Sequence, residues 1–186
     1  LGVGGIAVPL NVISPASEIQ RELDTIQPRI VFVEPAAMTA WSNVDRSSLT
    51  ELRAVIATEG HDIAGAITLT ESLMHAPVPI LNMSPTEVAV FIFTSGTAGS
   101  PKAAMLTHNN LHSNLVQISN ENVLRNTDVV YGVLPLFHIF GLNVVLGYTL
   151  FVGASVVLVQ RFDPSTALET FAAVSYTHLR AHETKA

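Results

Sequence analysis

Residues 88–102 of this chain read Val-Ala-Val-Phe-Ile-Phe-Thr-Ser-Gly-Thr-Ala-Gly-Ser-Pro-Lys, an apolar run that passes directly into hydroxyl residues, glycines and a lysine. The β-branched and aromatic residues at its start favour a buried strand. Gly96 and Gly99 permit the positive φ angles and close approach with which backbone N–H groups surround an anion. Lys102 is the only formally charged residue of the segment 88–120 when the histidines are neutral. The stretch therefore predicts a strand and a phosphate-binding loop, the alternative being a hairpin loop without a ligand.

The spacing of this loop differs from that of a Walker phosphate loop. The pattern G-x-x-x-x-G-K-[ST] places lysine directly after the second glycine, whereas Pro101 stands between Gly99 and Lys102 here. A short apolar segment follows the lysine, and Thr107 is the first candidate N-cap, for a helix through Asn120. We therefore expect the loop to join two strands and not to open a helix.

Residues 94–102 resemble the phosphate-binding signature T-S-G-[TS]-[TSA]-G-x-P-K-G of the adenylate-forming superfamily, which includes acyl-CoA synthetases, luciferases and nonribosomal peptide synthetase adenylation domains. The resemblance covers residues 1–174 and is strongest to acyl-CoA synthetases, the fatty-acid or aryl-acid CoA ligases. Ala103 departs from the pattern, which usually has glycine there. Further blocks are similar to these enzymes in the right order: 7–11 (AVPLN), 106–111 (LTHNNL), 134–142 (LPLFHIFGL) and 153–158 (GASVVL).

The resemblance implies an ATP-dependent ligase that uses Mg²⁺, activates a carboxylic acid as an acyl-adenylate and transfers the acyl group to coenzyme A. Lys102 would neutralise phosphate charge and help pyrophosphate leave, because electrostatic stabilisation dominates such reactions. The alternative for Lys102 is an ordinary surface lysine. The residues that the resemblance assigns to ATP are Thr94, Ser95, Gly96, Thr97, Ala98, Gly99 and Lys102.

His138 is the second candidate catalytic residue. It precedes an apolar segment, so a neutral imidazole there could bond an unpaired helix N–H or a bound carboxylate. The resemblance places this position near the reacting carboxylate and the mouth of the acyl pocket. The alternative is a histidine that only caps the helix.

The order of the predicted elements indicates an α/β fold. Ser14 is expected to cap a helix that starts at Pro15, and short apolar strands are expected at 29–34 and 54–57, with a helical stretch at 47–53 between them. Strands that alternate with helices predict a layered, mainly parallel sheet with crossover helices. By resemblance this is part of the N-terminal domain of an adenylate-forming enzyme.

We expect that partial AMP-binding domain to occupy residues 1–174, with sub-regions at about 1–75 and 86–174 joined by a proline-containing connection. Residues 175–186 lack strand periodicity and resemble the peptide obtained when sequencing-adapter DNA is read as protein. They are predicted to be a foreign or unstructured tail.

Composition excludes several classes of function. The net charge is −6 and the nine basic residues are scattered, whereas nucleic-acid binding needs clustered Lys and Arg. No cysteine is present, which removes disulfides and cysteine-based sites and is compatible with a reducing compartment. We expect a cytoplasmic enzyme, or one peripheral to a membrane.

Two other patterns do not require a membrane span or a metal site. Residues 129–160 contain no charged side chain, but polar residues interrupt them, so a buried helix followed by a strand is preferred to a membrane span. His108 and His112 are four residues apart, as are His178 and His182, but neither pair has a third zinc ligand, and no metal site is predicted.

Three functions are compatible with these sequence features. The first is a fragment of an acid–thiol ligase, itself inactive because the resemblance places later catalytic signatures outside it and the missing remainder of the parent enzyme would supply them. The second is a non-catalytic nucleotide- or phosphate-binding module, and the third is an adenylation domain that loads a carrier-protein thiol. The sequence does not name the acid.

Overall fold

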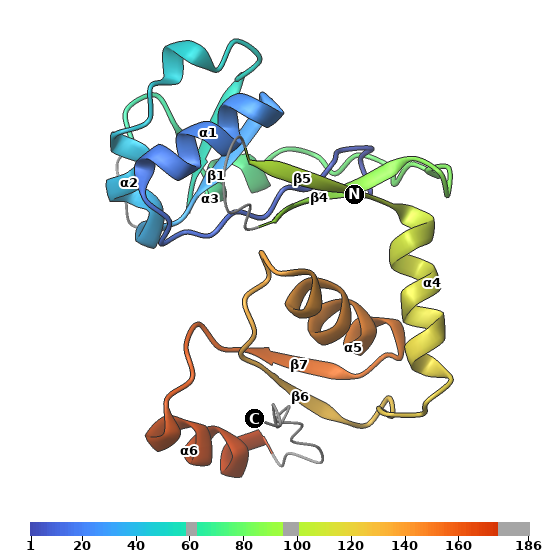
Figure 1. The fold of residues 1–186 in the computed structure, drawn as a ribbon. Coiled ribbons are helices and arrows are strands. Elements are labelled where there is room, and N and C mark those ends of the chain that lie inside the picture. The colour runs from blue at the N-terminus through green and yellow to red at the C-terminus, as the bar shows by residue number, and fades with distance from the viewer. Residues whose placement is uncertain (59–62, 95–100, 175–186) are drawn as a thin grey trace. The chain divides into compact units, whose positions relative to one another are not determined.

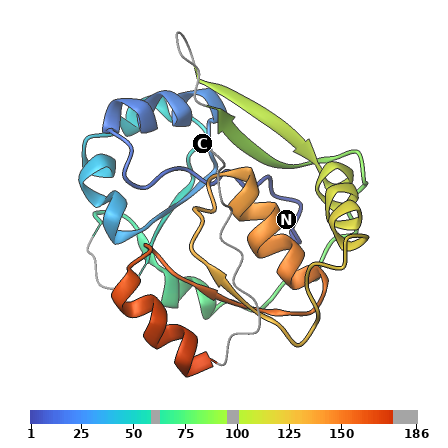
Figure 2. The same cartoon turned by 60° about the horizontal axis from the view of Figure 1, so that its bottom comes forward.

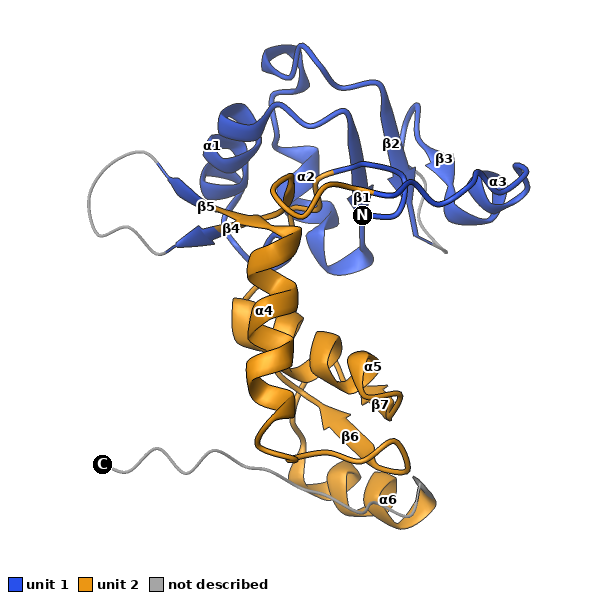
Figure 3. Cartoon of the chain, turned by 90° about the vertical axis from the view of Figure 1, so that its right-hand side faces the viewer, with its two compact units in different colours: residues 1–5, 10–82, 93–104 blue, residues 6–9, 83–92, 105–186 orange. Residues whose placement is uncertain are grey.

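The computed structural model describes residues 1–58, 63–94 and 101–174. The chain divides into two compact units, coloured separately in Figure 3. Unit 1 comprises Leu1–Gly5, Leu10–Asn82 and Phe93–Ala104, and unit 2 comprises Ile6–Pro9, Met83–Ile92 and Met105–Ala186. The sub-regions expected from the sequence stay a prediction.

Unit 1 is built on a parallel three-stranded sheet in the order β1-β2-β3 (Figure 3). Ile30 pairs with Ala54 in β1 and β2, and Ile56 pairs with Ile67 in β2 and β3. We call β1, β2 and the segment between them, residues 30–57, the first crossover. The elements of the unit are α1 (Ala16–Ile26), β1 (Ile30–Val33), η1 (Pro35–Ala37), α2 (Met38–Ser42), η2 (Arg46–Ser48), β2 (Ala54–Ala57), β3 (Ile67–Thr68) and α3 (Leu69–Leu73).

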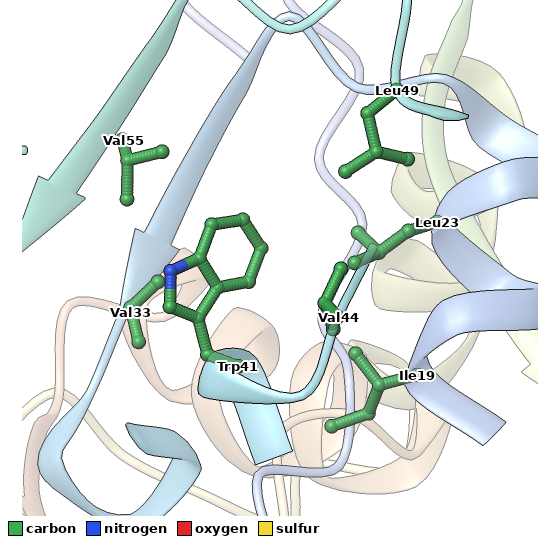
Figure 4. Close-up of a cluster of buried hydrophobic side chains, with 7 residues drawn as sticks. All are labelled: Ile19, Leu23, Val33, Trp41, Val44, Leu49 and Val55. Atoms are coloured by element: carbon green, nitrogen blue, oxygen red, sulfur yellow. The ribbon is translucent and has the colours of Figure 1, made fainter. Parts of the chain in front are cut away.

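Apolar side chains from one face of this sheet, from α1 and α2, and from the segment that follows α2 form the core of unit 1. Trp41 of α2 lies among residues of the strands and of α1 and is only 5 % exposed (Figure 4). Burying large apolar side chains is the main force that holds such a layer together. The seven buried members of the cluster are Ile19, Leu23, Val33, Trp41, Val44, Leu49 and Val55.

Two details of unit 1 correct the sequence analysis. Ser14 does not cap α1: Pro15 does, because its ψ of 147° is extended and its carbonyl accepts the N–H groups of Glu18 and Ile19 at 2.9 and 3.1 Å. The helical stretch expected at 47–53 is a single 3₁₀ turn, η2, whose Ser47 N–H is accepted by the Asp45 side chain. The connection between β1 and β2 is helical earlier, over η1 and α2.

Strands β4 (Val88–Thr94) and β5 (Lys102–Thr107) pair with each other, and the boundary between the units crosses both. The two expected strands are therefore confirmed, and the predicted loop between them lies outside the described residues. Ala7 forms a parallel bridge with Val90. Its N–H donates to the Ala89 carbonyl and its carbonyl accepts the Phe91 N–H, each at 3.0 Å. Ala89, Val90 and Ile92 are buried and form the core of unit 2.

Unit 2 contains a second parallel pair, β6 with β7, in which Val129 pairs with Ser155. We call these strands and the helix between them, residues 129–158, the second crossover. The views in Figures 1 and 2 show that helix, η3 with α5, lying along the strand pair. The elements of the unit are α4 (His108–Ser119), β6 (Val129–Gly132), η3 (Phe140–Tyr148), α5 (Thr149–Phe151), β7 (Ser155–Leu158) and α6 (Pro164–Val174).

The fold is α/β with mainly parallel pairing, as predicted. Thr107 is the N-cap of α4, as predicted, and the helix ends at Ser119 with Asn120 as its C-cap. Gly153 has a φ of +77° two residues after the end of α5, so it supplies a left-handed turn between that helix and β7. Within the described ranges, no helix is long and apolar enough to cross a membrane.

Candidate functional site

The two ends of the predicted phosphate loop are held together. Thr94 is the last residue of β4 and Lys102 is the first residue of β5. The Thr94 hydroxyl donates a hydrogen bond to the Lys102 carbonyl over 3.3 Å. Of the residues predicted to bind ATP, those between the strand ends lie outside the described residues: Ser95, Gly96, Thr97, Ala98 and Gly99.

The parts of β4 and β5 that belong to unit 2 are held by burial and by a helix cap. Ala89 and Val90 of β4 are 0 % and 2 % exposed, which fixes the strand that leads to Thr94. At the end of β5, the Thr107 hydroxyl accepts the Asn110 N–H at 3.1 Å, while the Asn110 side chain accepts the Thr107 N–H at 3.0 Å. This reciprocal capping fixes the point where β5 becomes α4. Lys102 itself is exposed.

His138 stands at the start of the second-crossover helix in unit 2 and is exposed. Its Nδ1 atom accepts the Phe140 N–H at 3.3 Å, its own N–H donates to the Pro135 carbonyl, and its carbonyl accepts the Leu142 N–H. A neutral imidazole whose Nδ1 accepts must carry its proton on Nε2. The ring therefore caps the helix through one nitrogen and keeps a hydrogen-bond donor on the other.

The helix that follows His138 has two features that the sequence analysis did not identify. Residues 140–148 form a π-helix, a rare conformation that often occurs at functional sites. A side chain at Gly141 would overlap the Pro135 carbonyl, whose carbon would lie only 2.8 Å from the added Cβ atom. Only glycine allows this close approach, which no periodicity or composition rule predicts.

Asn143 is the buried polar residue of the π-helix, 6 % exposed. Its amide nitrogen donates to the Leu111 carbonyl at 3.3 Å and to the Asn114 side chain at 2.9 Å, both on α4. Both amide protons are therefore satisfied inside the protein, which burial requires. These bonds tie the His138-bearing helix to the helix that follows β5.

The predicted site residues thus fall in two groups. Thr94 and Lys102 belong to unit 1 and are joined by a hydrogen bond, whereas His138 belongs to unit 2. Across the described residues, no three His, Asp or Glu side chains come together as a metal site. The His108 and His112 pair lies on α4, where the His112 ring packs edge-on against Phe151 at 5.8 Å. His178 and His182 lie outside the described residues.

The strongest electrostatic perturbation lies away from these residues. Burial raises the pKa of Glu22 on α1 from its usual 4.5 to about 7, with the nearby charge of Glu18 adding to the rise and Arg21 opposing it. One oxygen of its carboxyl group is buried without a hydrogen-bond partner, as is the Trp41 indole nitrogen. Glu22 therefore belongs to the packing of unit 1 and not to the candidate site.

Comparison with known proteins gives a consistent result. A family model described as AMP-binding enzyme matches residues 1–182. The chain is 30 % identical over 173 residues to 4-coumarate–CoA ligase 2 of Solanum tuberosum, covering 90 % of this chain and 31 % of that protein. It is also 30 % identical over 165 residues to the sulfoacetate–CoA ligase of Cupriavidus necator, covering 89 % of this chain and 32 % of that protein.

A solved structure shares the fold. The crystal structure of ATP-bound MatB from Rhodopseudomonas palustris superposes with a TM-score of 0.74 and 26 % sequence identity. The match covers 92 % of this chain and 33 % of that one. The chain thus spans about a third of the length of the proteins it matches.

Proposed function

This chain belongs to the AMP-binding enzyme family, and from that premise we propose that the protein containing it is an ATP-dependent acid–thiol ligase. The enzyme would activate a carboxylic acid as an acyl-adenylate and then transfer the acyl group to coenzyme A. The proposal rests on the β4–β5 strand pair and on the hydrogen bond between Thr94 and Lys102 at its end. These two residues hold the ends of the segment that contains Ser-Gly-Thr-Ala-Gly, the sequence that resembles the phosphate-binding signature.

In the first step, a carboxylate oxygen of the acid attacks the α-phosphorus of ATP, and the bond from that phosphorus to the bridging oxygen of pyrophosphate breaks. Negative charge grows on the departing pyrophosphate. Lys102 has the full positive charge to stabilise it, and the Thr94–Gly99 segment has the hydroxyl and N–H donors. In the second step, a thiol sulfur attacks the acyl carbon and AMP leaves.

His138 is proposed to orient the acid. Because its Nδ1 is used by the Phe140 N–H, its Nε2–H is the group that could donate to a carboxylate oxygen. This bond would orient the acid without transferring the histidine proton. The role differs from that of Lys102, which acts on the leaving group.

Mg²⁺ has no ligand set among the described residues, which bring no three acidic or histidine side chains together. We therefore derive no step through the metal and assign it to the triphosphate, since protein-bound Mg²⁺ is commonly held by substrate phosphates with few carboxylates. Coenzyme A is proposed as the acceptor because the matched relatives named above are CoA ligases. The acid is left open, since those two relatives are named for an aromatic acid and a sulfonated one.

The proposal is tested in the complete protein by acid-dependent exchange of labelled pyrophosphate into ATP, over a panel of aryl, short-chain and long-chain acids. At least one acid should support exchange, and the same acid should yield an acyl-CoA when coenzyme A is added. Exchange followed by acylation of a carrier protein but not of coenzyme A would favour a carrier-loading domain. No exchange with any acid, together with intact ATP binding, would favour a non-catalytic binding module.

Lys102→Ala should lower the exchange rate by about 10²-fold or more, the typical loss when one group that stabilises transition-state charge is removed. Arg161→Ala is the matched control, because it removes an exposed positive charge from outside the candidate site. Unchanged exchange in Lys102→Ala would rule out the proposed role of Lys102. We also expect the 186-residue chain alone to form no acyl-adenylate.

A further inference from the structure

The start of the second-crossover helix packs inside unit 2 through apolar side chains. Ile139 and Leu142 pack against the buried core of this unit on β4, and Leu111 of α4 packs against the same core. Apolar burial is non-directional, so these contacts hold the helix against the strand without fixing its rotation about its own axis. A directional contact is needed to fix that rotation.

Asn143 supplies the directional contact. The Leu111 carbonyl can only accept a hydrogen bond, so the Asn143 group that lies 3.3 Å from it is the amide nitrogen. The same nitrogen donates its second proton to the Asn114 side-chain oxygen at 2.9 Å. Both partners belong to α4, so a rotation of the helix would distort both bonds. Because both amide protons are used, Asn143 has no donor left for a ligand.

Gly147 confines the Asn143 amide from the side of its own helix. A Cβ atom added at Gly147 would lie 3.2 Å from the Asn143 side-chain oxygen and 3.5 Å from the Leu115 side chain of α4. The first distance is shorter than ordinary van der Waals contact, so a larger residue at this position would displace the amide. The amide is therefore held between α4 and its own helix.

His138 is attached to the first turn of this helix by two hydrogen bonds. Its carbonyl accepts the Leu142 N–H at 3.0 Å, and its Nδ1 accepts the Phe140 N–H at 3.3 Å. A rotation of the helix would therefore move the imidazole ring. Moving a positioning group by about 1 Å can slow a reaction by about 10²-fold, so the rotation of this helix bears on catalysis.

We propose that Asn114 is a positioning residue of the ligase: through Asn143 it sets the rotation of the second-crossover helix and so the place of the His138 Nε2–H. Asn114 is exposed on α4, whereas Asn143 is 6 % exposed. Without the Asn114 oxygen, a buried Asn143 proton loses its acceptor, which costs more than the bond itself contributes. The helix then turns to satisfy the amide, and His138 turns with it. This inference rests on the proposed function, in which His138 orients the acid.

The test is acid-dependent pyrophosphate exchange by the complete protein. Asn114→Ala should lower kcat/KM for the acid by about tenfold, the upper range for one lost hydrogen bond, and should leave the KM for ATP unchanged. Asn114→Asp keeps an acceptor for the Asn143 amide and should restore most of the activity. Gln117→Ala is the matched control, because it removes an exposed amide from the same helix and should not alter the exchange.

A double-mutant cycle shows whether Asn114 acts through His138. In a His138→Ala background, Asn114→Ala should cause no further loss of exchange. Additive losses, unchanged exchange in Asn114→Ala, or equal losses in Asn114→Ala and Asn114→Asp would each overturn this inference and leave the proposed function intact. Unchanged exchange in His138→Ala, or no exchange in the wild type with any acid, would overturn the proposed function and this inference with it.

Discussion

The chain contains two parallel strand–connection–strand units that differ in how they are packed. In the first crossover the connection is broken into short helical pieces, and one large side chain, Trp41, fills the space between strands and helices. In the second crossover the connection is a continuous helix. Its Gly141 lies close against the backbone of Pro135, and its Asn143 has a buried side-chain amide. The same topology is thus stabilised by apolar side chains in one region and by close backbone approach and hydrogen bonds in the other.

The two kinds of packing differ in how firmly they fix the position of a helix. Packing by apolar side chains tolerates small shifts, because several contacts adjust together. A helix fixed by a glycine contact and by directional hydrogen bonds has fewer alternatives, which suits the region that carries His138. The proposed site residue His138 lies in the second crossover, whereas the first crossover contains none of the proposed site residues.

The largest effect is expected in the core over the first crossover. Leu23→Ala should lower the free energy of unfolding by about 3 to 5 kcal/mol, because Leu23 is 2 % exposed and its truncation leaves a cavity. Trp41 is the only tryptophan, so its fluorescence during urea unfolding reports on this region alone. Leu73→Ala, at a site 74 % exposed in the same unit, should change the midpoint little. Equal losses in the two variants would contradict the assigned core.

The second prediction addresses the second crossover. Gly141→Ala should lower the free energy of unfolding by about 3 kcal/mol, since the added methyl group must displace the Pro135 backbone. Thermal unfolding followed by far-UV circular dichroism measures the loss. Gly5→Ala is the matched control, because nothing lies within 4 Å of its Cβ position. If the two variants unfold at the same temperature, the close contact between Gly141 and Pro135 does not contribute to the stability of this helix.

The third prediction tests a polar group inside the apolar region. The pKa of Glu22 is raised to about 7 in the folded protein, against the usual 4.5, so folding binds a proton between these pH values. Its contribution to stability is therefore complete below pH 4.5 and is lost as the pH rises through 7. The loss should be about 2 kcal/mol, less than the full shift implies, because residual contact with water screens the charge.

Urea unfolding of the wild type and Glu22→Gln, followed by Trp41 fluorescence at several pH values, measures this effect. The variant should be the more stable of the two above about pH 7.5, and this advantage should disappear near pH 4.5. Glu18→Gln, which removes the neighbouring charge, should show only a fraction of the change. A stability difference that does not vary with pH would show that Glu22 is not buried as a neutral acid.

The smallest effect compares the first helix turns of the two units. Thr107→Ala should lower the free energy of unfolding by about 1 kcal/mol, because it removes the capping bond to Asn110, whereas Thr107→Ser keeps that bond. Ser14→Ala should have a smaller effect, since Ser14 is not the cap of α1. Circular dichroism melts of the three variants rank them, and a larger loss for Ser14→Ala would reverse the assignment.

Several local features can be predicted from sequence because neighbouring residues determine them. The strand at 88–94 follows from its apolar composition, and the start of α4 follows from the Thr107 cap. The same capping rule predicts Ser14 as a cap, but the extended ψ of Pro15 moves the helix start by one residue. The short helices of the first crossover differ from the prediction: the connection is helical over η1 and α2, and α2 carries the buried core residue Trp41.

The order of residues alone indicates the family resemblance, the two strands at 88–94 and 102–107 and the solitary charge of Lys102 in the segment 88–120, since all three depend on residues close together in the chain. The folded chain is needed to show which His138 nitrogen is occupied, why Gly141 must lack a side chain and where Asn143 finds its partners. The partners of Asn143 on α4 are distant in sequence, whereas the contacts of His138 and Gly141 are short in sequence but depend on the three-dimensional path of residues 135–141. Hydrophobic periodicity identifies which side chains must be buried but does not specify the residues that bury them.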